Sequence, residues 1–211
     1  NKNNIMNFGD TLRDLMNNVS KAENGIKSVD AALKALEKWQ QAVASGDPDT
    51  IAKAKAELEK VLDTIGSPYK ENLKDAIDDW KNGVDTDGSG LKTSLEMEKS
   101  DITDALKKEI EELKKALKSD KDMEGIGIDP TDSVLKSVLA YLNGLDLDNS
   151  TNLDGLHSGM NEIFGKMNNS VSGKMQDLQT DLLGALDSND KKFSKELADN
   201  VSTINNSMDA I

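Results

Sequence analysis

The sequence predicts an all-α protein built as an elongated coiled coil or helical bundle. Apolar residues recur every three or four positions over long stretches, which is the spacing of helices that pack along one stripe. Aromatic residues make up only 3% of the 211 residues and hydrophobic residues 36%, which suits narrow seams between helices better than a thick core. Glycine and proline punctuate the ends of the first periodic stretches.

The first expected helix carries a regular heptad from Ile5. Steps of three and four average 3.5 residues, which keeps one stripe facing a partner helix in a left-handed supercoil. The stripe skips Gln40 and resumes at Val43. Gly9 and Gly25 lie off it and are expected to weaken the helix by up to about 1 kcal/mol each relative to Ala. The stripe consists of Ile5, Phe8, Leu12, Leu15, Val19, Ala22, Ile26, Val29, Leu33 and Leu36.

An N-terminal helical hairpin is predicted over residues 1–66. Gly46 should end the first helix, Asp47 should cap the second, and Pro48 occupies the first position of the second helix. A two-residue turn between capped helices implies antiparallel neighbours. The apolar stripe of the second helix consists of Ile51, Leu58, Val61, Leu62 and Ile65.

Residues 67–118 are expected to hold two central helices joined by a loop rich in Asp and Gly. The first helix is predicted over residues 69–82, the loop over 83–92, and the second helix from about Ser94 to Lys118. The predicted apolar stripes consist of Tyr69, Leu73, Ile77 and Trp80 in the first helix and Leu95, Ile102, Leu106, Ile110, Leu113 and Leu117 in the second.

The remaining chain is expected to contain a small insertion and a long C-terminal helix. Gly125, Gly127 and Pro130 interrupt the helical pattern within residues 119–152, where one short helix is predicted. No proline occurs over residues 153–211, which predicts one long helix. Its stripe runs through Leu153, Leu156, Met160, Ile163, Phe164, Met167, Val171, Met175, Leu178, Leu182, Leu186, Phe193, Leu197, Val201, Ile204, Met208 and Ile211.

Composition argues against several classes of function. The formal net charge is −13 and no basic cluster occurs, so nucleic acid and anionic membranes should be repelled. The chain has no cysteine, which excludes disulfides, thiolate metal sites and cysteine nucleophiles. His157 is the only histidine and is expected to be a surface or satisfied helix residue. No Gly-rich phosphate loop is present. We therefore expect no enzymatic activity.

One segment has a pattern typical of calcium binding. Residues 85–96 match the D-x-[DN]-x-[DNS]-G-x5-E loop of EF-hands and have a predicted helix on each side. The ligands would be Asp85, Asp87, Ser89, the Leu91 carbonyl and Glu96. Lys92 stands where EF-hands keep an apolar residue, and the sequence has no second hand. The alternative is a capping box of Thr93 and Glu96 at the start of the following helix.

The order of these segments resembles that of the needle-tip proteins of bacterial type III secretion systems. Those proteins have an N-terminal helical hairpin, a long central coiled coil, an inserted smaller domain and a long C-terminal helix. The stretch from Trp80 to Gly88 is similar to the bend rich in Trp and Gly after the family's central helix. Residues 175–180 and 199–204 are similar in character to its last helix. Secretion-filament proteins, which polymerise through paired terminal helices, are similar as well.

This resemblance implies a secreted, non-enzymatic structural protein at the bacterial cell surface. It would act in virulence as a needle-tip or filament component, and its coiled-coil surfaces would contact needle or filament subunits, translocators or host proteins. A homo-oligomer is one form such an assembly takes. Two alternatives stay open: a calcium-binding helical module in which residues 85–96 set the angle between two helices, and a surface-exposed helical adhesin or antigen.

The interaction surface is expected on the C-terminal helix. Apolar side chains there need either an intramolecular partner or another protein to cover them. The residues expected to make this contact are Phe193, Leu197, Ile204 and Met208.

Overall fold

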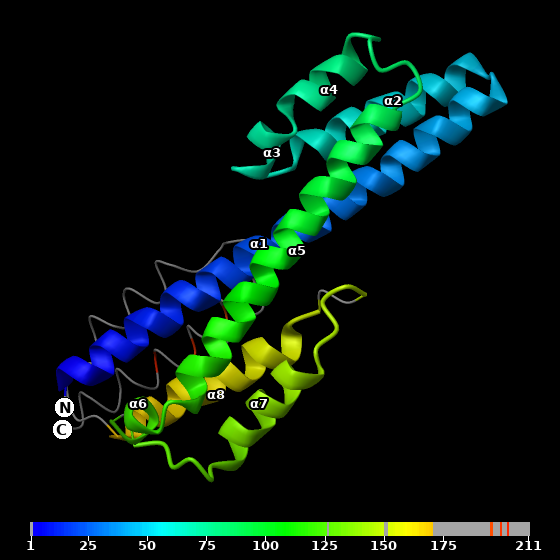
Figure 1. Cartoon of the computed structure of the whole chain (residues 1–211). Coiled ribbons are helices and arrows are strands. Elements are labelled where there is room, and N and C mark those ends of the chain that lie inside the picture. The colour runs from blue at the N-terminus through cyan, green and yellow to red at the C-terminus, as the bar shows by residue number, and fades with distance from the viewer. Residues whose placement is uncertain are drawn as a thin grey trace. The chain divides into compact units, whose positions relative to one another are not determined.

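A computed structural model describes residues 2–125, 127–149 and 152–170, together with residues 195, 199 and 202. Throughout these residues the regular structure is helical, which confirms the all-α prediction (Figure 1). In chain order the helices are α1 (Lys2–Ser45), α2 (Pro48–Asp63), α3 (Tyr69–Asn72), α4 (Lys74–Lys81), α5 (Ser89–Lys118), α6 (Asp120–Gly125), α7 (Ser133–Gly144) and α8 (Asp154–Ser170). Within the same residues, every helix is too short or too polar to cross a membrane.

The chain divides into two compact units. Unit 1 contains residues 1–21 and the chain from Leu106 onward, and unit 2 contains residues 22–105. The boundaries between the units fall inside α1 and α5. The four segments expected from the sequence instead follow the loops between helices.

The buried stripe of α1 follows the expected heptad from Phe8 to Leu36 except at Leu15 and Leu33, which are half-buried. Beyond Leu36 it continues through Trp39 and Ala42, which are buried, whereas Val43 is 41% exposed. The predicted gap at Gln40 followed by a return at Val43 is therefore wrong. The physical reason is that a straight helix turns every 3.6 residues, so a strict 3.5-residue repeat drifts around it. Gln40 lies beside the stripe, and its Nε2 donates a hydrogen bond to the carbonyl oxygen of Asp87 at 3.0 Å.

The turn between α1 and α2 matches the prediction residue by residue. Gly46 has a φ of +73°, which favours glycine, and Pro48 is the first residue of α2. The Asp47 carboxylate accepts a hydrogen bond from the Thr50 N–H at 3.3 Å and caps the helix. In Figure 1, α2 runs back alongside the end of α1.

The predicted helix over residues 69–82 is two helices, α3 and α4, separated at Leu73. Near the break, Tyr69 at the start of α3 packs closely against Gly25 of α1, a contact that the local sequence does not predict. A Cβ atom built on Gly25 of α1 would lie 2.5 Å from Cε2 of Tyr69, so Tyr69 occupies the space that a larger residue would fill. Leu73, which lies at the break, is buried. Gly25, expected only to weaken α1, therefore makes room for Tyr69.

In unit 1, α7 and α8 form a second close helix pair. Cβ atoms built on Gly155 and Gly159 of α8 would overlap the side chains of Tyr141 and Val138 of α7. Small residues four positions apart thus let the two helices approach closely. His157 lies on the same helix and is only 4% exposed, so it is not a surface residue.

Candidate functional site

The segment with the calcium-loop pattern forms the N-terminus of α5. This helix begins at Ser89 rather than near Ser94, so the second half of the pattern is helical. The Asp85 carboxylate accepts hydrogen bonds from the N–H groups of Gly90 at 3.3 Å and Leu91 at 2.8 Å. Asp87 accepts one from the N–H of Ser89 at 3.0 Å. These carboxylates satisfy donors that the first turn of a helix leaves without partners.

Charge favours this arrangement as well. A carboxylate at a helix N-terminus interacts favourably with the helix dipole. The hydrogen bond from the Ser89 N–H lowers the pKa of Asp87. Because the folded-state pKa is lowered, the stabilisation is fully present above the ordinary Asp pKa of about 3.9 and is lost as the pH falls through the lowered value.

The prediction that Thr93 and Glu96 form a capping box is wrong. Thr93 lies inside α5, where its Oγ1 donates a hydrogen bond to the carbonyl oxygen of Ser89 at 3.0 Å. The capping role belongs to Asp85 and Asp87, because α5 starts five residues earlier than the sequence pattern suggested.

The structure does not bring the five predicted calcium ligands together. Asp85 and Asp87 accept hydrogen bonds from the first turn of α5, and Glu96 lines a groove together with residues of α1. Among the described residues, no three His, Cys, Asp or Glu side chains are grouped so that they could hold a metal ion. Calcium binding by residues 85–96 therefore stays a prediction.

Substitution of Asp85 separates calcium binding from helix capping. If the carboxylate caps α5, Asp85→Ala should lower the free energy of unfolding by about 1 kcal/mol. Asp85→Asn should lower it less, because the amide oxygen keeps one of the two acceptors that Gly90 and Leu91 use. If it binds calcium, about 5 mM calcium should raise the melting temperature, and both substitutions should abolish the rise. Thermal melts of the three proteins with and without calcium measure this. A calcium-dependent rise that both substitutions abolish would show calcium binding at Asp85, and a stability loss without any calcium-dependent rise would show capping alone.

Two tryptophans anchor α1 against α4 close to this segment. Trp39 and Trp80 meet edge to face, with ring centroids 5.5 Å apart and an interplanar angle of 88°. They are 8% and 3% exposed, so both are packing residues. Gly88 lies against the same cluster, because its Cβ atom would come 2.9 Å from Cδ1 of Leu36. Its φ of +75° also favours glycine. Both the lack of space for a side chain and the backbone conformation therefore require glycine directly before α5.

Beside this cluster lies an open groove of about 600 Å³ between α1 and α5. Both helices supply lining residues, and all of them belong to unit 2. Apolar residues at helical spacing on α1 alternate with charged and amide side chains. The lining consists of Asp30, Leu33, Lys34, Leu36, Glu37, Gln40, Gln41, Ala44, Lys92 and Glu96. Such a surface suits the binding of another helix, whereas chemistry that requires exclusion of water needs a closed site.

Charges in the groove are only partly compensated within the molecule. Asp30 pairs with Lys99 at 3.0 Å and with Lys34 at 3.2 Å. Burial raises the pKa of Asp30, but hydrogen bonds from the two lysines outweigh it, and the pKa is lowered. Within the described residues Glu37, Lys92 and Glu96 form no ion pair.

No protein-family model, curated protein or solved structure matches this chain. The assignment of function therefore depends on the residues and on the arrangement of the helices. The groove is the site that sequence reasoning missed. Leu33 belongs to the predicted apolar stripe of α1, yet it is only half-buried and lines the groove. The predicted contact residues Phe193, Leu197, Ile204 and Met208 lie outside the described residues.

Proposed function

We propose that this chain is a secreted, non-enzymatic structural protein that assembles with other protein subunits at a bacterial surface, as a needle-tip or filament component of a type III secretion system. The observation that carries this proposal is the groove between α1 and α5, whose helical walls present uncompensated charges. A solvent-open groove of this kind is suited to receive a helix.

The distribution of apolar side chains supports the same function. Most large apolar residues of the described helices are buried in seams between helices. Among the described residues the large exposed ones are Val43, Val84 and Met97, which are too few for a broad apolar patch. Recognition by this part of the chain would therefore depend on shape and charge along the helices, which favours specific and reversible assembly.

Deletion of residues 193–211 tests the assembly role of the C-terminal stretch. We expect the deletion to abolish association measured by sedimentation velocity, because it removes the apolar residues predicted to make the contact. The helical hairpin of α1 and α2 should remain folded, as judged by circular dichroism. A full-length protein with Phe193→Ser, Leu197→Ser, Ile204→Ser and Met208→Ser should behave like the deletion. Unchanged association in both proteins would contradict the role of this stretch.

A further inference from the structure

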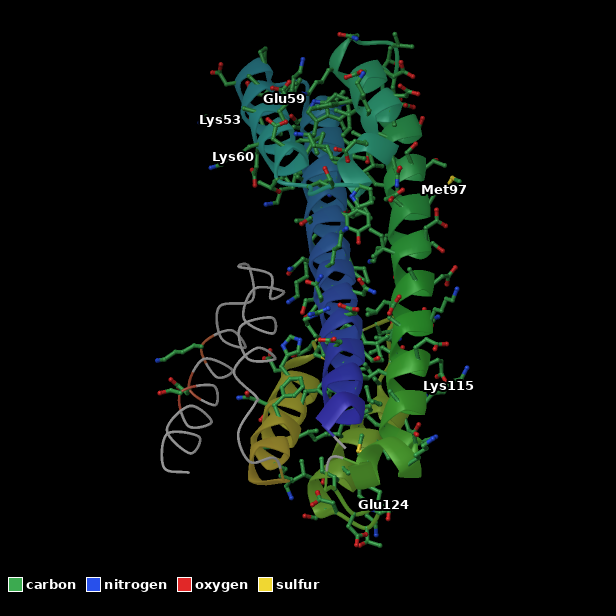
Figure 2. All side chains as sticks on the ribbon, turned by 90° about the vertical axis from the view of Figure 1, so that its left-hand side faces the viewer. Lys53, Glu59, Lys60, Met97, Lys115 and Glu124 are labelled. Carbon is green, nitrogen blue, oxygen red and sulfur yellow. The ribbon has the colours of Figure 1, made fainter. Side chains whose placement is uncertain are left out.

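The face of α2 that points away from α1 has no partner within the described residues. α2 packs through Leu58 and Leu62, which are buried. Figure 2 shows Lys53 and Lys60 on the opposite side of the helix. Ala52 and Ala56 are exposed as well. Small residues on an exposed helix face allow a neighbouring helix to approach closely.

The dimensions of this face match those of the groove. At 1.5 Å per residue, the 16 residues of α2 make a rod about 24 Å long. The α1 wall of the groove runs from Asp30 to Ala44, which corresponds to about 21 Å, and the α5 wall from Lys92 to Glu96, which corresponds to about 6 Å. Most of the length of α2 could therefore lie along the α1 wall of the groove.

The charges of the two surfaces are complementary. The uncompensated charges in the groove are the carboxylates of Glu37 and Glu96 and the ammonium of Lys92. On α2 the charged groups that form no ion pair within the described residues are the ammonium groups of Lys53, Lys55 and Lys60 and the carboxylates of Asp49 and Glu59. The unpaired charges of the groove therefore sum to −1 and those of α2 to +1, and Lys53 and Lys60 are the positive charges on the side of α2 opposite Leu58 and Leu62.

We propose that α2 of one molecule docks into the α1–α5 groove of a second copy of this chain. This inference rests on the proposed function and names the contact by which copies assemble. α2 is held against its own α1 by a two-residue turn, so its outward face cannot reach the groove of the same molecule. The contact is therefore made between molecules.

The proposed contact joins copies head to tail. The groove and the outward face of α2 share no residue, so one molecule can use both surfaces at once. A contact of this heterologous kind closes into a ring or continues as a helical filament, depending on the rotation between copies. The net charge of −13 makes copies repel each other. Attraction between the opposite charges of the groove and of α2 would overcome this repulsion at the contact.

Charge reversal on each surface tests the contact in the full chain. Variant A carries Glu37→Lys and Glu96→Lys in the groove, and variant B carries Lys53→Glu and Lys60→Glu on α2. Each variant alone places like charges in contact, so its self-association should be at least about tenfold weaker than that of the unmodified chain. An equimolar mixture restores opposite charges at every contact, because the groove of A meets α2 of B and the groove of B meets α2 of A. Sedimentation velocity should show association in the mixture.

A third variant controls for net charge. Asp101→Lys with Asp104→Lys changes the net charge by the same four units as variant A, on exposed positions of α5 outside the groove. General repulsion predicts that this control and variant A both associate more strongly than the unmodified chain. Docking predicts that variant A alone loses association. Circular dichroism melts establish that every variant is folded.

Several results would overturn the proposal: an unmodified chain that stays monomeric, a variant A that associates normally, or a mixture that does not associate. These results differ from failure of the proposed function. An assembly that depends on residues 193–211 but ignores variants A and B would leave the proposed function standing, with the groove free to receive a helix of a different subunit, and would eliminate only the docking of α2 between copies.

Discussion

Trp80→Ala is expected to lower the free energy of unfolding by roughly 3–5 kcal/mol, which is a large part of the stability of a domain. Trp80 is buried, and its ring meets Trp39 edge to face. Such aromatic pairs contribute about 0.5–1.5 kcal/mol beyond their buried area. The indole Nε1 has no hydrogen-bond partner within the described residues, so the loss comes from packing alone.

Urea denaturation followed by circular dichroism measures this loss. Trp80→Phe should cost less than Trp80→Ala, because it keeps an aromatic ring beside Trp39. Met97→Ala is the control, since Met97 is an exposed residue of α5, and it should change stability by less than about 0.5 kcal/mol. A loss below about 1 kcal/mol in Trp80→Ala would mean that the tryptophan pair does not hold α4 against α1.

Gly159→Leu should destabilise unit 1 by roughly 3 kcal/mol, at the upper end of the usual cost of overpacking. Even the Cβ atom of a substituted residue would overlap Cγ2 of Val138, and Val138 is buried in α7. Leucine adds three further carbons at the same place, so α7 and α8 must separate or shift.

Two companion substitutions make this second prediction specific. Gly144→Ala should be neutral or stabilise by up to about 1 kcal/mol, because nothing lies within 4 Å of the added carbon and Ala favours helix. Gly159→Ala combined with Val138→Ala should be less destabilised than the sum of the two single changes, because the second substitution removes the overlapping methyl group. Strict additivity in denaturant melts would show that the two residues are not in contact.

Local chemistry explains why much of the fold could be predicted from the sequence. Gly46, Asp47 and Pro48 end and start helices through backbone conformation and capping, which depend only on near neighbours. The stripe from Phe8 to Leu36 follows from helical spacing. The same local rules placed the start of α5 too late, because the carboxylates of Asp85 and Asp87 cap it from residues that the pattern assigned to a loop.

The features that escaped prediction depend on residues far apart in the chain. Tyr69 packs against Gly25, which is too far away in the sequence for a periodic pattern to indicate the contact. The break between α3 and α4 at Leu73 lies close to this contact in the sequence. The groove escaped prediction for the same reason: Glu37 and Glu96 share it only because α1 and α5 are neighbours in unit 2. Glu96 was expected to bind calcium or to cap a helix, and its place in the groove supports a third role in binding another copy.

Electron microscopy of intact producing bacteria with gold-labelled antibody tests the central claim most directly. A secreted needle-tip or filament component should be labelled outside the cell, at the ends or along the length of surface appendages. Labelling confined to the cell interior, with bare appendages, would contradict the proposed function.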